Sequence, residues 1–271
     1  DPSLTLAIPW LTIETEEIKT STRSDTLKAL STVSVKGKIK DFLGNVVTDF
    51  NGVLEASLFD KPTEFVTTGK NDPPFTFNQW HNTLFRGKAS VKNGEFEFQL
   101  IVPKNISYQV GNGRVSAYAS DTVAFRDAGG SAYFKIGGTE ENFIADHTPP
   151  SVKLFMGDTT FNNGGLTGTN TTLVAAVSDL SGINLSNYGI GNTMTAILDD
   201  DQSYFVDEYY ESEIDDFTRG WIHFPLNDLA PGKHSITLKI WDTHNNPAET
   251  SIDFVVTDGE SLIVVSFGNY P

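Results

Sequence analysis

The stretch of sequence that decides the fold is Ala89-Ser90-Val91-Lys92-Asn93-Gly94-Glu95-Phe96-Glu97-Phe98. An Asn-Gly pair tolerates positive φ at both central positions of a type I′ turn, which joins two antiparallel strands through a two-residue loop. After the turn, Phe96, Phe98 and Leu100 alternate with polar residues, so they fall on one face of a strand. The stretch therefore predicts a β-hairpin with one buried face and one solvated face.

The same alternation recurs on both sides of this hairpin, between turns rich in glycine, proline and asparagine. We expect further strands at 33–40, 54–58, 114–119, 131–136, 152–155, 172–178, 194–198, 220–224, 235–241 and 249–256. Helical periodicity is weak, and only residues 24–30 are expected to form a helical turn or two. Many short strands separated by turn signals are typical of β-sandwich proteins.

A break in this pattern divides the chain. Residues 137–150 end in Pro149-Pro150, which favours an extended linker. The formal charge changes at the same place, from −3 over residues 1–147 to −13 over residues 148–271. We therefore predict an all-β chain with two β-sandwich domains in tandem. The first would span residues 12–147, and the second, Ig-like, would span residues 148–258.

The composition argues against several classes of function. A formal net charge of −16 would repel phosphate backbones, so nucleic acid is not an expected partner. The chain has no cysteine, so it can form no disulfide, thiolate nucleophile or cysteine-ligated metal site. We find no apolar run approaching the roughly 20 residues of a membrane span. Neither a Gly-x-Ser-x-Gly elbow nor a phosphate-binding glycine loop occurs, so we expect no catalytic or cofactor-binding residue here.

The histidines and one loop contain side chains of the types that bind metals. No two of the five histidines have the spacing of a helical zinc motif, and we expect none of them to be a ligand. Asp242 and Asn245 lie in a loop of side chains that could bind calcium. Such residues more often cap a turn by accepting backbone N–H bonds, and this is the role we predict.

The acidic segment, residues 199–216, is the one unusual feature. It has no basic residue, and its nine carboxylates are Asp199, Asp200, Asp201, Asp207, Glu208, Glu211, Glu213, Asp215 and Asp216. Calcium prefers carboxylate oxygens, although the spacing here is not that of an EF-hand. Asp199, Asp200, Asp201, Asp207 and Glu208 are therefore candidates for a calcium site or a partner surface. The aromatic residues interleaved with these acids favour the alternative. In it, the segment is a solvated connection between strands that is anchored by its aromatic side chains.

A family resemblance emerges from phrases in order along nearly the whole chain. They are Phe50-Asn51-Gly52, Leu58-Phe59-Asp60-Lys61, 87–94, 102–108, 178–184, 189–192 and 241–246. Together they resemble the non-catalytic C-terminal region of PorU-like sortases, gingipain-type cysteine peptidases of the type IX secretion system in Bacteroidetes. Residues 1–11 resemble the end of the preceding peptidase domain, and residues 259–271 resemble the start of a truncated C-terminal sorting domain.

The resemblance implies an accessory tail rather than an enzyme. The parent protein would be an exported cysteine endopeptidase, on the outer-membrane surface or outside the cell, that processes secreted cargo. Its catalytic residues would lie in the peptidase domain, outside this chain. Partners would be other secretion-machinery proteins and the cargo. The alternative is an independent extracellular adhesion or carbohydrate-binding module, in which Trp80 and Trp221 could stack on sugars instead of packing into a core.

Overall fold

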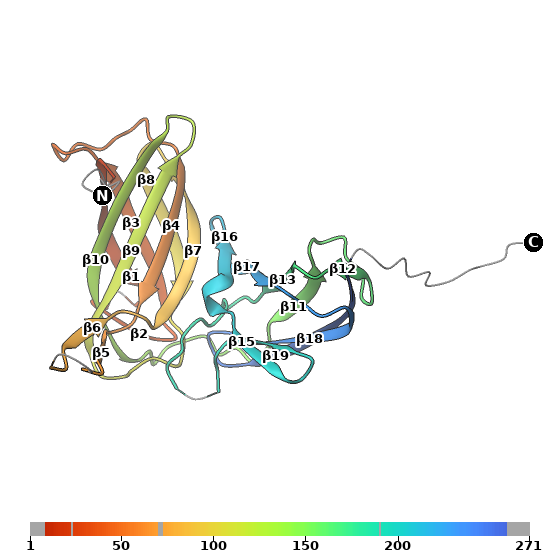
Figure 1. Cartoon of the computed structure of the whole chain (residues 1–271). Helices are drawn as coiled ribbons and strands as arrows, with labels where there is room; N and C mark the ends of the chain where they lie inside the picture. Colours follow the sequence, from red (N-terminus) through yellow and green to blue (C-terminus); the bar gives the residue numbers. More distant parts are fainter. Residues whose placement is uncertain (1–8, 23, 70–72, 190, 259–271) are drawn as a thin grey trace, which may run out of the picture.

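The structure is a computed structural model that describes residues 9–22, 24–69, 73–189 and 191–258. The prediction of an all-β chain is confirmed, because the described elements are 19 strands and one short 3-10 turn. Two groups of strands follow one another along the chain (Figure 1). In the described residues, no helix has the length and apolar character needed to cross a membrane. The expected sorting-domain start at 259–271 lies outside the described residues, as do residues 1–8 of the expected peptidase-domain end.

The first group of strands forms a barrel. Its strands are β1 (Leu11–Thr20), β2 (Thr26–Ala29), β3 (Thr32–Lys40), β4 (Gly52–Phe59), β5 (Thr63–Val66), β6 (Thr76–Gln79), β7 (Thr83–Lys92), β8 (Glu95–Ile101), β9 (Gly111–Asp121) and β10 (Arg126–Thr139). The main sheet has the order β1-β3-β8-β7-β4-β9-β10-β2, and β1 also pairs with β10. That extra pairing closes seven strands into a ring, while β5 and β6 form a separate hairpin.

Two predictions for this part of the chain are corrected. Residues 12–147 were expected to form a sandwich of two sheets, but the β1–β10 pairing joins the sheet to itself around one interior. Residues 24–30 were expected to be helical, but Thr26–Ala29 is strand β2, which runs parallel to β10. The short alternation of buried and half-buried residues in β2 fits a strand, because Leu27 and Ala29 point into the core.

The predicted hairpin at residues 89–98 is confirmed. Asn93 and Gly94 have φ values of 53° and 74°, and Lys92 pairs with Glu95 across the turn. Phe96, Phe98 and Leu100 are buried in the barrel core, whereas the residues between them are exposed. The period of two in the sequence therefore sets which face of β8 is inside.

The second group of strands forms two sheets that share one core. The elements are β11 (Ser151–Met156), β12 (Leu166–Gly168), β13 (Thr171–Ser178), β14 (Thr195–Leu198), β15 (Gln202–Phe205), η1 (Asp207–Tyr209), β16 (Tyr210–Glu213), β17 (Asp216–Leu226), β18 (Gly232–Trp241) and β19 (Pro247–Thr257). One sheet has the order β11-β13-β17-β16 and the other β12-β19-β18-β14-β15. Buried residues of both sheets, such as Leu173, Ile222 and Leu238, belong to a single cluster. This is the arrangement of a sandwich.

Candidate functional site

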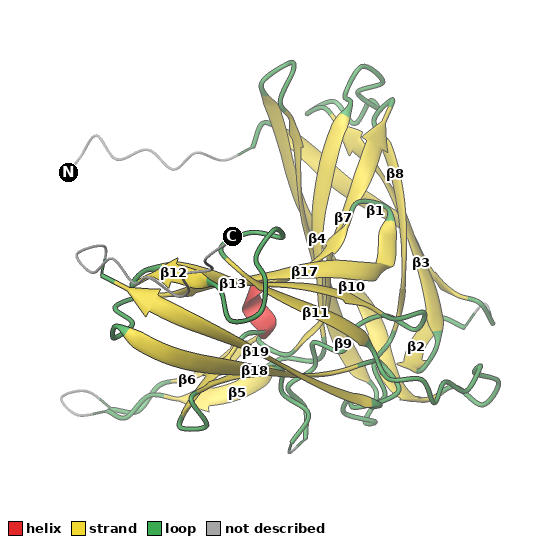
Figure 2. Cartoon of the chain, turned by 90° about the vertical axis from the view of Figure 1, so that its right-hand side faces the viewer, coloured by secondary structure: helices red, strands yellow, loops and turns green. Residues whose placement is uncertain are grey.

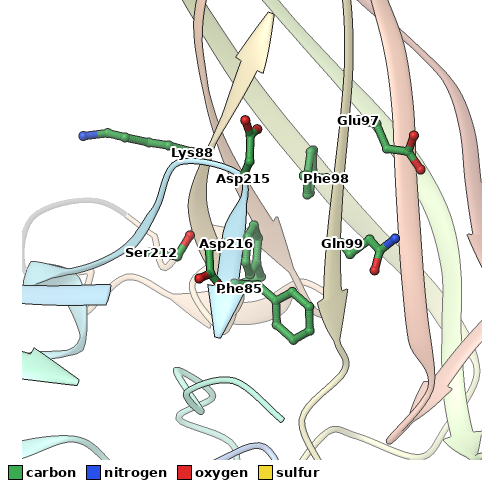
Figure 3. A pocket seen from close by; sticks show the side chains of 9 residues that line it. Phe85, Lys88, Glu97, Phe98, Gln99, Ser212, Asp215 and Asp216 are labelled. Atoms are coloured by element: carbon green, nitrogen blue, oxygen red, sulfur yellow. The ribbon is translucent and has the colours of Figure 1, made fainter. Parts of the chain in front are cut away.

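The junction between the two units begins at a gap in the barrel wall. Within the described residues, β7 and β8 pair only next to their turn, through Val91↔Phe96 and Lys92↔Glu95. Farther from the turn, the β16–β17 hairpin of the second unit reaches the barrel (Figure 2), and its tip lies at the gap (Figure 3). Phe85 and Phe98 stack across the gap with ring centroids 5.6 Å apart. A hollow of about 320 Å³ remains here, lined by β7, β8 and the hairpin.

Asp215, at the tip of this hairpin, takes the place of a strand partner for β7. Its carboxylate accepts hydrogen bonds from the backbone N–H of Ser90 at 2.7 Å and from the Ser90 hydroxyl at 2.6 Å. Its own N–H donates to the carbonyl of Lys88 at 3.0 Å, and Ile214 forms a parallel bridge with Lys88. Unpaired strand edges expose backbone groups that need partners. The second unit therefore supplies part of the pairing that β8 does not provide.

Basic residues of β7 meet the acidic segment at the same place. The Lys88 ammonium lies 2.7 Å from the Glu211 carboxylate. Arg86 donates to the backbone carbonyls of Glu208 at 2.6 Å and Asp207 at 3.3 Å. Between these two basic residues, a Cβ on Gly87 would overlap a side chain of β16, so glycine permits the close approach of the strands.

A second contact between the units is polar and centres on a buried side chain. The Asn184 side chain, which is 1% exposed, donates to the amide oxygens of Asn105 at 2.7 Å and Asn245 at 2.9 Å. It also accepts the backbone N–H of Ser186 at 2.8 Å. Asn82 of the barrel accepts from the Ser186 hydroxyl at 3.2 Å. Each buried amide therefore has partners in the other unit, as buried polar groups require.

The five candidate residues of the acidic segment lie in two different elements. Asp199, Asp200 and Asp201 form the turn between β14 and β15, where Asp199 and Asp200 have positive φ. Asp199 binds His234 at 2.7 Å and accepts the N–H of Ser235. In contrast, Asp207 and Glu208 belong to η1 at the junction with the barrel.

The basic partners of this segment were not predicted from the sequence. They come from the other unit, so the sequence of residues 199–216 alone carries no sign of them. The available signal was the spacing of Arg86 and Lys88, two residues apart just before the expected hairpin at 89–98, which places both on one face if the strand begins earlier.

A second carboxylate group lies where the linker meets the sandwich. Asp146, Asp242 and His244 each place one potential ligand atom so that all three lie within 4.8 Å of one another. Asp242 accepts the backbone N–H groups of His244 at 2.9 Å and Asn246 at 2.7 Å, which confirms its predicted role as a turn cap. His244 was not expected to join such a group, because its neighbour Asp146 is distant in the sequence.

Asp146 and Asp242 interact electrostatically with a third carboxylate, that of Asp179. Burial raises the pKa of Asp179, and the charges of Asp242 and Asp146 raise it further. Burial also raises the pKa of Asp242, against the hydrogen bonds from Asn246. Backbone N–H donation by Thr148 holds the pKa of Asp146 below its usual range. Ionisation of Asp179 and Asp242 is thus disfavoured in the folded protein.

The two tryptophans considered for sugar stacking are both half-buried and engaged. The Arg114 guanidinium lies over the Trp80 ring, 5.6 Å from its centroid, and Tyr133 contacts the same ring at 5.9 Å. The indole N–H of Trp221 donates to Glu213 at 3.1 Å. Neither residue belongs to the two core clusters.

Comparison with known proteins gives an informative match to a solved structure. No family model matches, and no curated protein matches. The solved structure of dimeric latent PorU from Porphyromonas gingivalis matches 97% of this chain at 29% identity, with a TM-score of 0.52. Fibronectin(III)-like modules of CbhA from Clostridium thermocellum match 94% of this chain and 100% of their own at 11% identity, with a TM-score of 0.26 that supports no conclusion. This chain spans about 25% of the PorU chain and is similar in structure to that region of it.

Proposed function

We propose that this chain is a non-catalytic accessory tail of an exported, PorU-like cysteine endopeptidase. The observation that carries the proposal is the match to PorU over 97% of this chain. The tail would act at the outer-membrane surface or outside the cell. There it would hold the peptidase domain on the secretion machinery and help to present secreted cargo.

The junction between the two units supports a positioning role. A tail that orients another domain needs parts that keep a fixed relation to one another. Here the β16–β17 hairpin bonds to β7, and Asn184 links Asn105 of the barrel to Asn245 of the sandwich. Interfaces that include buried hydrogen bonds resist bending more than a linker alone would.

The proposal is tested in cells that make the parent protein. Residues 12–258 are deleted from its gene, and the sizes of the secreted cargo proteins are followed. We expect cargo to keep its sorting domains, because the peptidase would no longer be held at the secretion machinery. Normal cargo processing in the deletion strain would contradict the proposal. The purified chain itself is expected to cleave neither peptides nor unprocessed cargo, because it lacks the thiolate of a cysteine peptidase.

The alternative function, an independent adhesion or carbohydrate-binding module, is tested separately. Both candidate tryptophans are already engaged by Arg114, Tyr133 or Glu213, so the contacts do not favour sugar stacking. Binding to a glycan array that disappears in both Trp80→Ala and Trp221→Ala would support this alternative over the first proposal.

The limits of the two domains, 12–147 and 148–258, are also proposals. The proposed boundary lies in the connection between strand β10, which ends at Thr139, and strand β11, which begins at Ser151. Expressed separately, each fragment is expected to unfold cooperatively, with a lower midpoint than in the whole chain because the junction is lost. Fragments that do not fold alone would show that the two units form one cooperative domain.

Calcium binding by the acidic segment stays a prediction. Calorimetric titration of the whole chain with calcium is the test, using a variant in which Asp199, Asp200 and Asp201 are all replaced by Asn. Heat that vanishes in this variant would support a site at the turn. Heat that persists there but vanishes in Asp146→Asn would move the site to the linker group instead. Absence of heat would leave the turn as a solvated connection.

A further inference from the structure

Five large apolar side chains gather at one end of the barrel. Trp10, Phe42, Leu43, Val123 and Phe125 are between 71% and 92% exposed. The strand register brings them together, because Leu11 pairs with Ala128 and Thr12 pairs with Lys40. Figure 1 shows the β3–β4 and β9–β10 loops at the upper end of the barrel, away from the second unit. Exposed apolar groups gathered in this way mark interaction sites in soluble proteins.

The two loops are held rigid by hydrogen bonds at their bases. The Asp41 carboxylate accepts the N–H groups of Leu43 and Asn45, each at 2.9 Å. The Asp121 carboxylate accepts those of Val123 at 3.1 Å and Ala124 at 3.0 Å. These bonds fix the loop backbones, so the apolar side chains stay directed into solvent rather than folding back onto the barrel.

Arg126 joins the two loops into one unit. Its guanidinium donates to the Asp49 carboxylate at 3.1 Å, to the Asp49 carbonyl at 2.9 Å and to the Asp121 carboxylate at 3.0 Å. Phe125 adopts a φ of 51°, a conformation that is uncommon for an aromatic residue. A rigid arrangement loses little conformational freedom on binding, which favours association.

The distribution of charge indicates the kind of partner. The tips, Phe42-Leu43-Gly44 and Val123-Ala124-Phe125, carry no charge. Charged residues begin at the loop bases, where Asp41, Asp121 and Arg126 are bound within the loops. Each of the two loops, β3–β4 and β9–β10, therefore has an apolar tip above a polar base. A lipid bilayer matches that order, because it can close around protruding side chains without a preformed pocket, and tryptophan favours its interface.

We propose that this end of the barrel inserts its tips into an uncharged, zwitterionic lipid surface. A strongly anionic surface fits less well, because residues 1–147 carry a formal charge of −3 and the Asp41 and Asp121 carboxylates lie at the loop bases. This contact does not depend on the proposed accessory role. A lipid contact at the barrel end can succeed or fail whether or not the chain supports a peptidase.

The test is flotation of the whole chain with phosphatidylcholine vesicles. We expect bound protein and a blue shift of tryptophan fluorescence that is lost in Trp10→Phe. Replacing Phe42 and Leu43 by Ser and Phe125 by Asn should weaken binding about tenfold or more, since apolar burial is lost. Asn adopts positive φ readily, so the loop conformation is preserved. Vesicles of equal parts phosphatidylcholine and phosphatidylglycerol should bind more weakly.

The control variant carries Leu180→Ser and Phe205→Ser, two exposed apolar residues of the second unit. It should bind vesicles as the unmodified chain does, and the melting midpoints of all variants are compared to verify folding. Three results would overturn the proposal. They are no flotation of the unmodified chain, equal loss in the control variant, or self-association through these tips in light scattering without vesicle binding.

Discussion

Asn184 offers the sharpest test of how the two units are joined. Replacement by Ala removes three hydrogen bonds from a side chain that is 1% exposed. At about 1 kcal/mol for each bond, the free energy of unfolding should fall by about 3 kcal/mol. The loss includes the cost of leaving the Ser186 N–H buried without its acceptor. The amide oxygens of Asn105 and Asn245 lose the same donor, so the change should also weaken the contact between the barrel and the sandwich.

A double-mutant cycle isolates the contact between the units. Asn105→Ala alone should also destabilise the chain, because Asn105 donates to the carbonyls of Ser186 and Tyr188 as well. Combining it with Asn184→Ala should reveal a coupling energy of about 1 kcal/mol, the value of one hydrogen bond. Equilibrium unfolding in urea gives all four free energies, and Asn227→Ala on an exposed loop is the matched control.

Two outcomes would refute this reasoning. One is a loss below about 1 kcal/mol for Asn184→Ala, since three bonds to a side chain that is 1% exposed cannot be worth so little unless water replaces them. The other is additivity of the two single changes, which would mean that Asn184 and Asn105 do not interact in solution. Either result would leave the β16–β17 hairpin as the main connection between the units.

Three further changes test the hairpin, the close approach and the carboxylates. Asn93→Pro should lower stability by about 2 kcal/mol or more, because proline cannot adopt the φ of 53° found there, and an unchanged melting midpoint would contradict the turn assignment. Gly87→Val should separate the units and speed proteolysis of the linker, whereas Gly168→Val should not, because a Cβ there would make only an ordinary van der Waals contact with the Asn170 carbonyl. Burial raises the pKa of Asp179 above its value in the unfolded chain. The free energy of unfolding therefore falls as the pH rises from the unfolded pKa through the folded pKa, because the unfolded chain releases the proton first. With a metal chelator present, Asp179→Asn should therefore raise the melting midpoint at neutral pH but not at pH ~3, where Asp179 is protonated in both the folded and the unfolded protein. Equal shifts at both pH values would contradict this explanation.

The strands could be predicted because their signals are local. The Asn-Gly turn and the alternation after it specify the β7–β8 hairpin without reference to the rest of the chain. The closure of the barrel could not be predicted in this way. It depends on Leu11 and Thr12 pairing with Ala128 and Gly129, which are far apart in the sequence. A period of two indicates which face of a strand is buried, but it does not reveal which strand lies beside it.

The polar contact around Asn184 could not be predicted from the sequence, for a related reason. Asn184 follows a turn, and nothing nearby distinguishes it from a solvated loop asparagine. Its burial arises only when Asn105 from the barrel and Asn245 from a later loop converge on it. The same holds for Asp146, which joins Asp242 and His244 only in the folded chain. Polar residues of this kind have no periodic signal, since their positions are set by tertiary contacts.

For the acidic segment, net charges counted separately for each domain do not reveal that charges of one unit pair with charges of the other. The formal charges of −3 and −13 indicate a boundary near residue 147. In the folded chain, Glu211 is paired with Lys88, and Arg86 binds the carbonyls of η1. Part of the negative charge on the second unit therefore faces positive charge on the first. Such pairs are worth little when exposed, but they favour one relative orientation of the two units over others. The uneven charge is thus a feature of the contact between the units as much as a mark of the boundary between them.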